Sequence, residues 1–365
     1  MKPNMITIPR WFDRHLHIRK GEMMEIVLPH TIRQQATGAV IMGNLGHPDQ
    51  TSTIERALTY RQQINEVLDP LIYKDDEVPT LGVEPRFMPR MTCYLTDDIT
   101  PEEVVRGFDI GAWCAVKLYM ADQNGQGGTT GSQHGVRNLL RRYNVFAAME
   151  ENSIPLLGHF EAVERRVDEF DREFVSFERD LLPIIECFPK LPVVFEHITD
   201  GRVADFVARS TGYNLQATVT AHHLMINRNA MFENGMNPGH YCKPVPKREE
   251  HRLRVRKHVT SGNPRFGAGT DSAPHDESKK SHCYGCAAGI FTAPMAVEMY
   301  TTVFDEDDAL GHLGPFLSEN FLGVYGMKPS SEMMTIERAP LLVPQKAGTV
   351  QVFRGGTELP WSLVG

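Results

Sequence analysis

The chain has 365 residues, of which 41% are hydrophobic and 23% charged, a composition that suits a folded globular protein and excludes a largely disordered one. Its formal net charge is −8 and its lysines and arginines are dispersed, so it lacks the basic face of a nucleic-acid-binding protein. The N-terminus has no apolar signal core and no run approaches the roughly 18 apolar residues of a membrane span, so we expect a cytoplasmic protein without a membrane partner.

Short β-rich runs alternate with longer amphipathic runs along the chain, which predicts repeated β–α units. The expected strands are residues 11–18, 38–44, 88–95, 113–119, 154–161, 192–199, 215–222 and 266–272. The expected helices include residues 53–68, 101–108, 138–151, 172–187, 201–210 and 247–260, followed by 294–304 and 313–325. Thr100 is the expected N-cap of one of them, with Pro101 in its first turn.

About eight such units predict an α/β fold, a (β/α)₈ TIM barrel over residues 1–340 with extra C-terminal helices and a small appended segment over residues 341–365. An open doubly wound sheet is the alternative, but no Gly-x-Gly-x-x-Gly follows the first strand. The loop 121–135 is polar and rich in glycine, as is typical of a mobile lid.

Polar residues interrupt the apolar runs where the expected strands end, and they are His15, His17, Lys117, His159, His197 and Asp271. Each has an ordinary alternative, because a single histidine is often a hydrogen-bonded core residue, a lysine can reach the surface and an aspartate can serve a turn. Five independent chance occurrences of polar residues at strand ends are much less frequent than one shared functional site. In a barrel these side chains meet at the C-terminal face, where active sites lie.

The mixture of residue types indicates a metal centre. Imidazoles and carboxylates suit zinc, and two ions about 3.5 to 4 Å apart can share a bridging hydroxide that is nucleophilic at neutral pH. A free lysine would be a cation and would repel the metals. Lys117 could therefore serve only as a carbamate formed with carbon dioxide, which offers two oxygens and a negative charge. Asp271 would then ligate one metal and shuttle a proton as the catalytic residue.

This set of residues resembles the binuclear amidohydrolases, and the flanking segments narrow the resemblance to the dihydroorotase family of the single-function bacterial type. The matching segments are residues 13–19, 91–97, 117–119, 195–199, 223–225, 227–229, 241–242 and 269–275. They span most of the chain, from about residue 11 to residue 300.

The resemblance implies two Zn²⁺ ions bridged by hydroxide and by carboxylated Lys117, one bound by His15, His17 and Asp271 and the other by His159 and His197. It also implies that Arg19, Asn44 and His275 hold the substrate carboxylate, that Ala287 contacts the ring through its main chain, and that Thr129 and Thr130 belong to a closing lid. Arginine offers a planar fork that suits a carboxylate. The implied reaction is the reversible cyclisation of N-carbamoyl-L-aspartate to L-dihydroorotate in pyrimidine synthesis, carried out by a homodimer.

Three positions depart from the family pattern. Gly43 stands where proline is usual, His47 is an additional polar group beyond Asn44, and Lys243 replaces a usual leucine. An added cation beside a pocket for a dianionic acid either helps to bind that acid or indicates a different substrate. Another cyclic amidohydrolase, of hydantoinase or imidase type, is therefore the alternative enzyme, and a catalytically silent binding protein is the alternative from another class.

Overall fold

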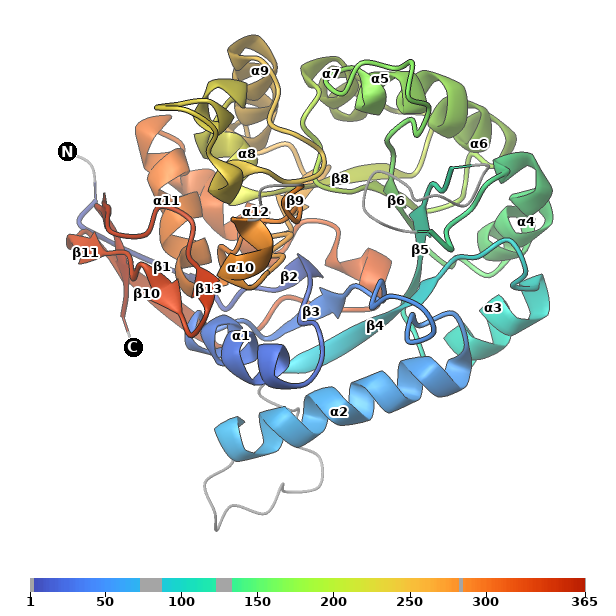
Figure 1. Ribbon diagram of the computed structural model, residues 1–365, viewed down its shortest axis with the longest axis horizontal. Coiled ribbons are helices and arrows are strands. Elements are labelled where there is room, and N and C mark those ends of the chain that lie inside the picture. The colour runs from blue at the N-terminus through green and yellow to red at the C-terminus, as the bar shows by residue number, and fades with distance from the viewer. Residues whose placement is uncertain (1–2, 73–86, 123–132, 282–284, 365) are drawn as a thin grey trace.

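The computed structural model describes residues 3–72, 87–122, 133–281 and 285–364, and its centre is an eight-stranded parallel sheet whose strands follow one another in chain order (Figure 1). The strands are β2 (Asp13–Leu16), β3 (Gly38–Ile41), β4 (Met88–Tyr94), β5 (Ala115–Tyr119), β6 (Leu156–His159), β7 (Val193–Phe195), β8 (Leu215–Val219) and β9 (Phe266–Ala268). A parallel bridge between Leu16 and Ser272 joins the last strand segment to the first. The predicted (β/α)₈ barrel is confirmed.

Helices surround the barrel (Figure 1). They are α1 (Glu22–Arg33), α2 (Ile54–Ile72), α3 (Pro101–Asp109), α4 (Tyr143–Glu151), α5 (Arg172–Ser176), α6 (Leu182–Cys187), α7 (Gly201–Arg209), α9 (Glu249–Thr260), α11 (Ala296–Glu306) and α12 (Leu313–Ser318). Thr100 caps α3 as predicted, because its side chain accepts a hydrogen bond from the backbone N–H of Glu103. In the described residues, no helix combines the length and apolar character that a membrane span requires.

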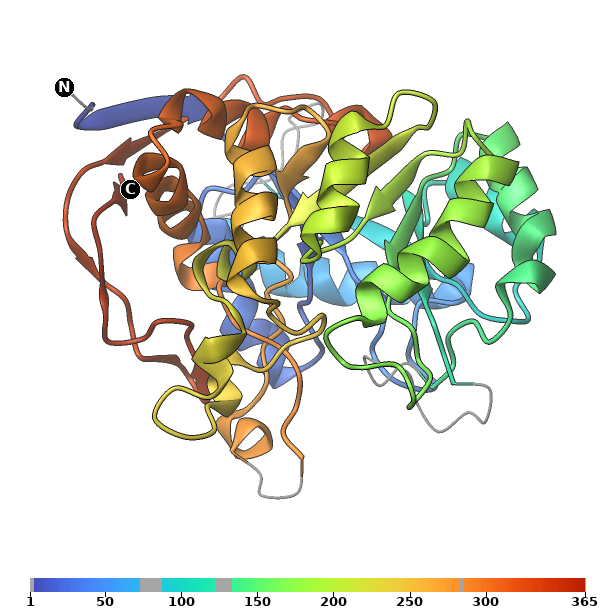
Figure 2. The same ribbon diagram turned by 90° about the horizontal axis from the view of Figure 1, so that it is seen from above.

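Short helical turns lie mostly in the connections. They are η1 (Leu139–Arg142), η2 (Phe177–Leu181), α8 (Ala221–Met225), η3 (Arg228–Met231), η4 (Pro238–His240), α10 (Glu277–Lys280), η5 (Ala293–Met295), η6 (Leu310–His312) and η7 (Leu322–Tyr325). In Figure 2 the loop around η3 and η4, in yellow, and α10, in orange, extend from the same end of the barrel. These loops follow β8 and β9, so they belong to the C-terminal face where the candidate site lies.

The two chain ends meet in a small antiparallel sheet beside the barrel. Its strands are β1 (Met5–Pro9), β10 (Met333–Glu337) and β15 (Ser362–Leu363), in the order β1–β10–β15. Two further strand pairs lie in the C-terminal part: β11 (Leu341–Leu342) with β14 (Glu358–Leu359), and β12 (Lys346–Ala347) with β13 (Val350–Gln351). The appended β-segment at residues 341–365 as a separate unit stays a prediction.

Candidate metal centre and active site

A cavity of about 390 Å³ opens at the C-terminal ends of the barrel strands. Its wall includes most of the residues predicted from the sequence, namely His15, His17, Arg19, Asn44, His159, His197, Lys243, Asp271, His275 and Ala287. These residues come from the full length of the chain, and the barrel brings them together. Thr129 and Thr130 lie outside the described residues.

One group in this cavity consists of two histidines from β2 and its end and an aspartate beyond β9. The Nε2 atoms of His15 and His17 lie 3.3 Å apart, and Asp271 Oδ1 lies 3.3 Å from the first and 3.1 Å from the second. Two nitrogens bound to one tetrahedral zinc are about 3.3 Å apart. The backbone N–H of Asp271 donates to the carbonyl of His15 at 2.9 Å, which fixes the aspartate beside β2. The spacing of the three side chains therefore fits one metal ion.

A second group lies next to the first. His159 Nδ1, at the end of β6, is 3.0 Å from His197 Nε2, which follows β7. The rings of His15 and His197 have centroids 5.1 Å apart, so the two groups adjoin. All four histidines are buried. This arrangement fits a second ion beside the first.

Two buried glutamates set the orientation of two of these rings. His15 Nδ1 donates to the carboxylate of Glu196, which leaves its Nε2 facing the cavity. His159 Nε2 donates to Glu161 at 2.7 Å, which leaves its Nδ1 facing His197. A carboxylate behind a ligating histidine is a frequent device that fixes the tautomer and raises the basicity of the ligand. Both rings are thus presented as metal ligands.

Charges and burial set the protonation of this centre. Burial, with a smaller contribution from the charge of Lys117, lowers the pKa of His15 to about 3, so its ring is neutral at pH 7. Burial alone would raise the pKa of Asp271, but His15 and His17 bring it well below the usual value, so this side chain is a carboxylate. Neutral imidazoles and ionised carboxylates are the forms that bind metals.

Lys117 lies on β5 with its side chain fully buried. Among the described residues its Nζ has no hydrogen-bond partner, and a carboxylate oxygen of Glu196 lies 3.6 Å away, at ion-pair distance. Burial lowers the pKa of Lys117 to about 7, although the charge of Asp271 acts in the opposite direction. A buried ammonium without a hydrogen-bond partner is costly, so burial favours the neutral amine.

Arg19 and His275 form the opposite part of the cavity. Arg19 Nη2 lies 3.1 Å from His275 Nε2, and its Nε donates to the carbonyl of Pro274 at 3.1 Å. The hydroxyl of Tyr60 donates to the carbonyl of Arg19 at 2.6 Å, which holds a residue whose φ is +67°. Asn44 Oδ1 is buried and has no hydrogen-bond partner in the part of the chain that the structure describes. These groups leave hydrogen-bonding capacity directed at a ligand.

Lys243 and Ala287 line the cavity but are already engaged. The ammonium of Lys243 forms an ion pair with Glu169, and its side chain is 8% exposed. The backbone N–H of Ala287 donates to the carbonyl of Lys279, and its own carbonyl accepts from Lys280 Nζ at 3.0 Å. That carbonyl keeps one lone pair for a substrate. The roles of both residues stay predictions.

His47 is the polar departure from the family pattern that follows Asn44. It lines a separate cavity together with His134, and the centroids of the two rings are 4.4 Å apart. His47 is not part of the wall of the cavity that holds the histidine groups. The polar departure at this position therefore does not alter the inner surface of the candidate site.

The sequence interpretation missed three residues that shape the site. Glu161 and Glu196 orient histidines, and the ring of Tyr119 lines the cavity with a buried hydroxyl that has no partner. A signal existed for both glutamates. Each lies within two residues of a strand-end histidine in an otherwise apolar run, where an acidic side chain is rarely buried without a partner.

Comparisons with known proteins identify relatives of the whole chain. No family model matches the chain. The dihydroorotase of Synechococcus sp. (strain CC9902) is 44% identical, over 96% of this chain and 96% of the relative. The dihydroorotase of Sphingopyxis alaskensis is 42% identical, over 98% of this chain and 99% of the relative.

Solved structures give the same result. The dihydroorotase of Saccharomyces cerevisiae, in complex with 5-fluoroorotic acid, superposes with a TM-score of 0.86 at 26% identity and 99% coverage of both chains. The Campylobacter jejuni dihydroorotase gives 0.80 at 27% identity, covering 99% of this chain and 97% of that one. The L-hydantoinase of Arthrobacter aurescens, at 13% identity and a TM-score of 0.78, covers 98% of this chain and 83% of that one and shares the fold.

The chain folds as a (β/α)₈ barrel, carries metal-ligand groups at the C-terminal face and is similar to these proteins. It is therefore a metal-dependent cyclic amidohydrolase. Identity of 42–44% over nearly the whole length narrows the class further. The chain belongs to the dihydroorotase family, whose reaction is a step of pyrimidine biosynthesis.

Proposed function

We propose that this chain catalyses the reversible cyclisation of N-carbamoyl-L-aspartate to L-dihydroorotate, with release of one water molecule, using two zinc ions. The observation that carries the proposal is that one cavity combines the two histidine groups and Asp271 with an arginine suited to a carboxylate, Arg19. A metal centre alone would support hydrolysis of many amides. The adjoining carboxylate anchor selects an acidic ring.

In this proposal one ion is bound by His15, His17 and Asp271, and the other by His159 and His197. The ligand-to-ligand distances of 3.0 to 3.3 Å support these sets. When bound, the two ions polarise the ring carbonyl and provide hydroxide at neutral pH. The contribution of the chain itself is to orient the ligands, hold the substrate and move the proton.

Lys117 is the proposed bridge between the ions. Its amine lone pair would form a bond to the carbon of carbon dioxide and lose one proton, which converts the side chain to a carbamate with one negative charge. The buried Nζ, which lacks a hydrogen-bond partner, supports this change because the carbamate oxygens would be satisfied by two cations.

Asp271 is the proposed proton carrier. In the hydrolytic direction an oxygen derived from water adds to the ring carbonyl carbon, the carbon–nitrogen bond breaks, and the departing nitrogen needs a proton. Asp271 would take that proton from the attacking group and deliver it to the nitrogen, which is general base and then general acid catalysis by one carboxylate. Its ionised form and its place in the cavity wall support this role.

The substrate carboxylate is the proposed ligand of Arg19, Asn44 and His275. The 3.1 Å contact of Arg19 with His275 brings two of these groups together. The amide oxygen of Asn44 has no hydrogen-bond partner among the described residues, so no such bond prevents this side chain from turning its Nδ2–H toward the carboxylate. Lys243 would add positive charge at the rim, shared with Glu169. Main-chain contact with Ala287 and closure by Thr129 and Thr130 complete the proposal.

A direct assay tests the substrate. Metal-replete protein is expected to interconvert dihydroorotate and N-carbamoyl-L-aspartate far faster than it hydrolyses hydantoin or cyclic imides. A hydantoinase-type or imidase-type activity is the alternative, because Lys243 in the cavity wall departs from the family pattern. Turnover of those compounds without turnover of dihydroorotate would select that alternative. A silent binding protein would turn over none of them.

Replacement of the lysine tests the bridge. Lys117→Ala is expected to lose bound metal and at least about 100-fold in activity, because the anion between two cations is gone, with partial recovery on adding short carboxylic acids. Lys190→Ala, at an exposed position, is the matched control. Activity and metal content equal to those of the wild type in Lys117→Ala would refute the bridging role.

We also infer that the enzyme acts as a homodimer, by analogy with the family. Light scattering coupled to size-exclusion chromatography of the full chain measures the mass directly. A mass of one chain of 41.1 kDa at working concentration would contradict the inference.

A further inference from the structure

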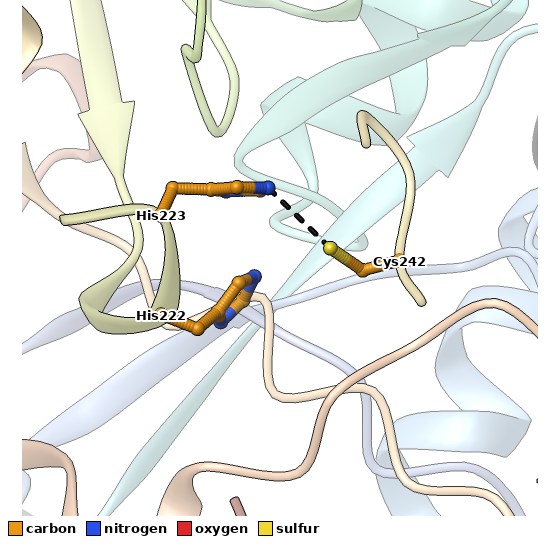
Figure 3. A group of neighbouring side chains, drawn as sticks. All are labelled: His222, His223 and Cys242. Carbon is orange, nitrogen blue, oxygen red and sulfur yellow. Dashed lines mark hydrogen bonds between the residues drawn. The ribbon is translucent and has the colours of Figure 1, made fainter. Parts of the chain in front are cut away.

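A second cluster of metal-ligand side chains lies beyond the end of β8, outside the residues assigned to the binuclear centre. His222 and His223 come from α8, and Cys242 comes from the loop that follows η4 (Figure 3). One ligand atom of each lies within 4.8 Å of the others. All three side chains are buried, with 0%, 4% and 1% of their surface exposed.

The imidazole of His222 is the first sign of a missing ligand. Both of its ring nitrogens are buried and have no hydrogen-bond partner among the described residues. A neutral imidazole carries one donor and one acceptor, and leaving both unpaired in the interior is unfavourable. In Figure 3 one of these nitrogens faces the space between Cys242 and His223. A metal ion at this point would accept the lone pair of that nitrogen.

The other two side chains have the spacing of zinc ligands. Cys242 Sγ lies 3.4 Å from His223 Nε2. A nitrogen and a sulfur bound to one tetrahedral zinc, at the usual bond lengths, are separated by about 3.5 Å. The carbonyl oxygen of Pro244 lies 2.9 Å from the same Nε2 and 3.4 Å from the same Sγ, so a fourth oxygen donor is at hand.

His223 also has the hydrogen bond that supports a ligating histidine. Its Nδ1 lies 2.8 Å from Thr220 Oγ1, the hydroxyl that caps α8. If Nδ1 carries the proton and donates it to this hydroxyl, Nε2 is left with a lone pair toward Cys242. An outer hydrogen bond of this kind fixes the ring and the tautomer of metal-bound histidines.

We propose that His222, His223 and Cys242 bind a third metal ion, of the zinc class, in addition to the two of the catalytic centre. Thiolate with imidazole is the ligand combination that zinc takes in proteins, whereas magnesium and calcium prefer oxygen. The site goes beyond the proposed function, because it shares no ligand with that centre and needs no substrate.

The position of Cys242 gives the ion a structural task. Its neighbours Tyr241 and Lys243 both line the catalytic cavity, whereas the histidines belong to the helical turn directly after β8. A metal bound between the two would fasten the cavity-lining segment to the barrel. Loss of the ion is expected to loosen Tyr241 and Lys243 without touching the ligands of the catalytic ions.

Zinc X-ray absorption on the wild-type full chain is the first test, since it needs no variant. The catalytic ligands contain only nitrogen and oxygen, so a zinc–sulfur shell at about 2.3 Å, averaging one sulfur for about three zinc ions, is expected. Elemental analysis of the same sample is expected to give about three zinc ions per chain. Zinc-loaded protein without sulfur scattering would overturn the proposal.

Cobalt substitution identifies the thiolate. Cobalt-loaded wild type is expected to show a sulfur-to-cobalt charge-transfer band in the near ultraviolet, and Cys242→Ser to lose this band and one equivalent of metal. Cys286→Ser, a thiol in the wall of the catalytic cavity, is the matched control and is expected to keep both. A band that persists in Cys242→Ser, or disappears in Cys286→Ser, contradicts the assignment.

Lys117→Ala separates this inference from the proposed function. The variant is expected to lose activity and catalytic metal yet keep the charge-transfer band, because Lys117 is not a ligand of the third ion. His222→Ala is expected to keep the catalytic metal, whereas its affinity for metal at the thiolate site falls by at least about 10-fold. If titration of the charge-transfer band gives the same cobalt affinity for His222→Ala and the wild type, His222 is not a ligand of the third ion.

Discussion

Single carboxylates decide which nitrogen His15 and His159 turn toward the candidate metal centre. His159 Nε2 donates a hydrogen bond of 2.7 Å to the buried carboxylate of Glu161, so Nδ1 of the same ring faces His197. Burial alone would raise the pKa of Glu161, but the hydrogen bond and charge of His159 lower it to about 2. The carboxylate is therefore ionised throughout the working range of pH, and it acts as a fixed acceptor.

Glu161→Gln is expected to weaken metal binding by about 10–100-fold, because the amide can also present a donor to the ring and no longer raises its basicity. Competition with a chelator of known affinity measures the change. Glu164→Gln is the matched control, since Glu164 pairs with Arg179 outside the metal-ligand groups. Equal chelator resistance of Glu161→Gln and the wild type would show that Glu161 does not support a ligand.

The hydroxyl of Tyr119 is a second residue-scale feature. It is buried in the cavity wall and has no hydrogen-bond partner among the described residues. The centroid of the Tyr119 ring lies 5.9 Å from that of the His159 ring. Tyr119→Phe is expected to lower kcat/KM by about 10-fold, which corresponds to one hydrogen bond to substrate or transition state.

Tyr325→Phe is the control for Tyr119→Phe. Its hydroxyl is equally buried and unpartnered, but it packs against Phe12, and neither residue is among those that line the catalytic cavity. Steady-state kinetics with both variants separates the two effects. A kcat/KM of Tyr119→Phe equal to that of Tyr325→Phe would show that the Tyr119 hydroxyl serves packing only.

At this scale the sequence predicted the side chains that end strands, whereas it marked the orienting glutamates only as acidic residues in apolar runs and did not indicate their partners. His15, His197 and Asp271 stand out because a polar residue closes an apolar run. Glu196 shares its run with His197, yet its partner is His15, 181 positions away in the chain. Only the closed barrel brings those two together, so no local pattern carries the pair.

At the scale of elements, the end of β3 depends on a close approach between Gly43 and Thr51. A Cβ at position 43 would lie 1.7 Å from Thr51 Oγ1. This hydroxyl cannot move freely, because it donates to the carbonyl of Thr92 at 2.6 Å and the side chain is fully buried. The glycine next to Asn44, where the family usually has proline, is thus linked to a threonine eight positions further on.

Gly43→Ala is expected to destabilise the protein by about 1–3 kcal/mol through this overlap. Gly43→Ala/Thr51→Ala is expected to recover part of the loss relative to the sum of the single variants, since the overlapping hydroxyl is gone. Gly212→Ala is the control, with open space around the added methyl and a change within about 0.5 kcal/mol. Urea unfolding measures all four variants, and strict additivity would exclude the contact.

Element boundaries were predicted less well than element types, for identifiable reasons. The strand expected over residues 215–222 ends at Val219, because Thr220 caps α8 by accepting from the N–H of His223. The helix expected over 172–187 is interrupted by the π-helical turn η2, just before a proline at position 183. Proline lacks the N–H that would continue the regular helix pattern. Both changes depend on one side chain within a correct apolar pattern.

At the scale of the whole molecule, the chain ends fasten each other beside the barrel. Met5 in β1 pairs with Glu337 in β10, and Ile336 pairs with Leu363. Arg338 binds both carboxylate oxygens of Asp305 on α11, at 2.8 and 2.9 Å. The pairing of β1 with β10 joins residues more than 300 positions apart and leaves no periodicity in the sequence, so the eight-unit barrel was predictable and this sheet was not.

Glu298 connects three of these distant parts. From α11 its Oε1 accepts from Gln34 Nε2, next to α1, and from the backbone N–H of Leu363 in β15, both at 3.3 Å. It is 2% exposed, and both donors are neutral. Burial raises the pKa of Glu298 from 4.5 to about 6, with the hydrogen bonds acting in the opposite direction. The folded protein therefore keeps this proton at a pH where the unfolded chain has lost it.

Stability must then fall as pH rises from about 4.5 through about 6, because in that window the folded state binds more protons than the unfolded state. The raised pKa corresponds to a loss of about 2 kcal/mol once the pH exceeds about 6. Glu298→Gln, which carries no proton to lose, is expected to lack this component, so its stability relative to the wild type rises by that amount between pH 4.5 and pH 7. Urea unfolding at several pH values gives the difference, in which all other titrating groups cancel. Glu151→Gln, at an exposed position, is the control, and its stability difference from the wild type is expected not to change with pH. If the stability difference between Glu298→Gln and the wild type is equally independent of pH, Glu298 is ionised in the folded protein.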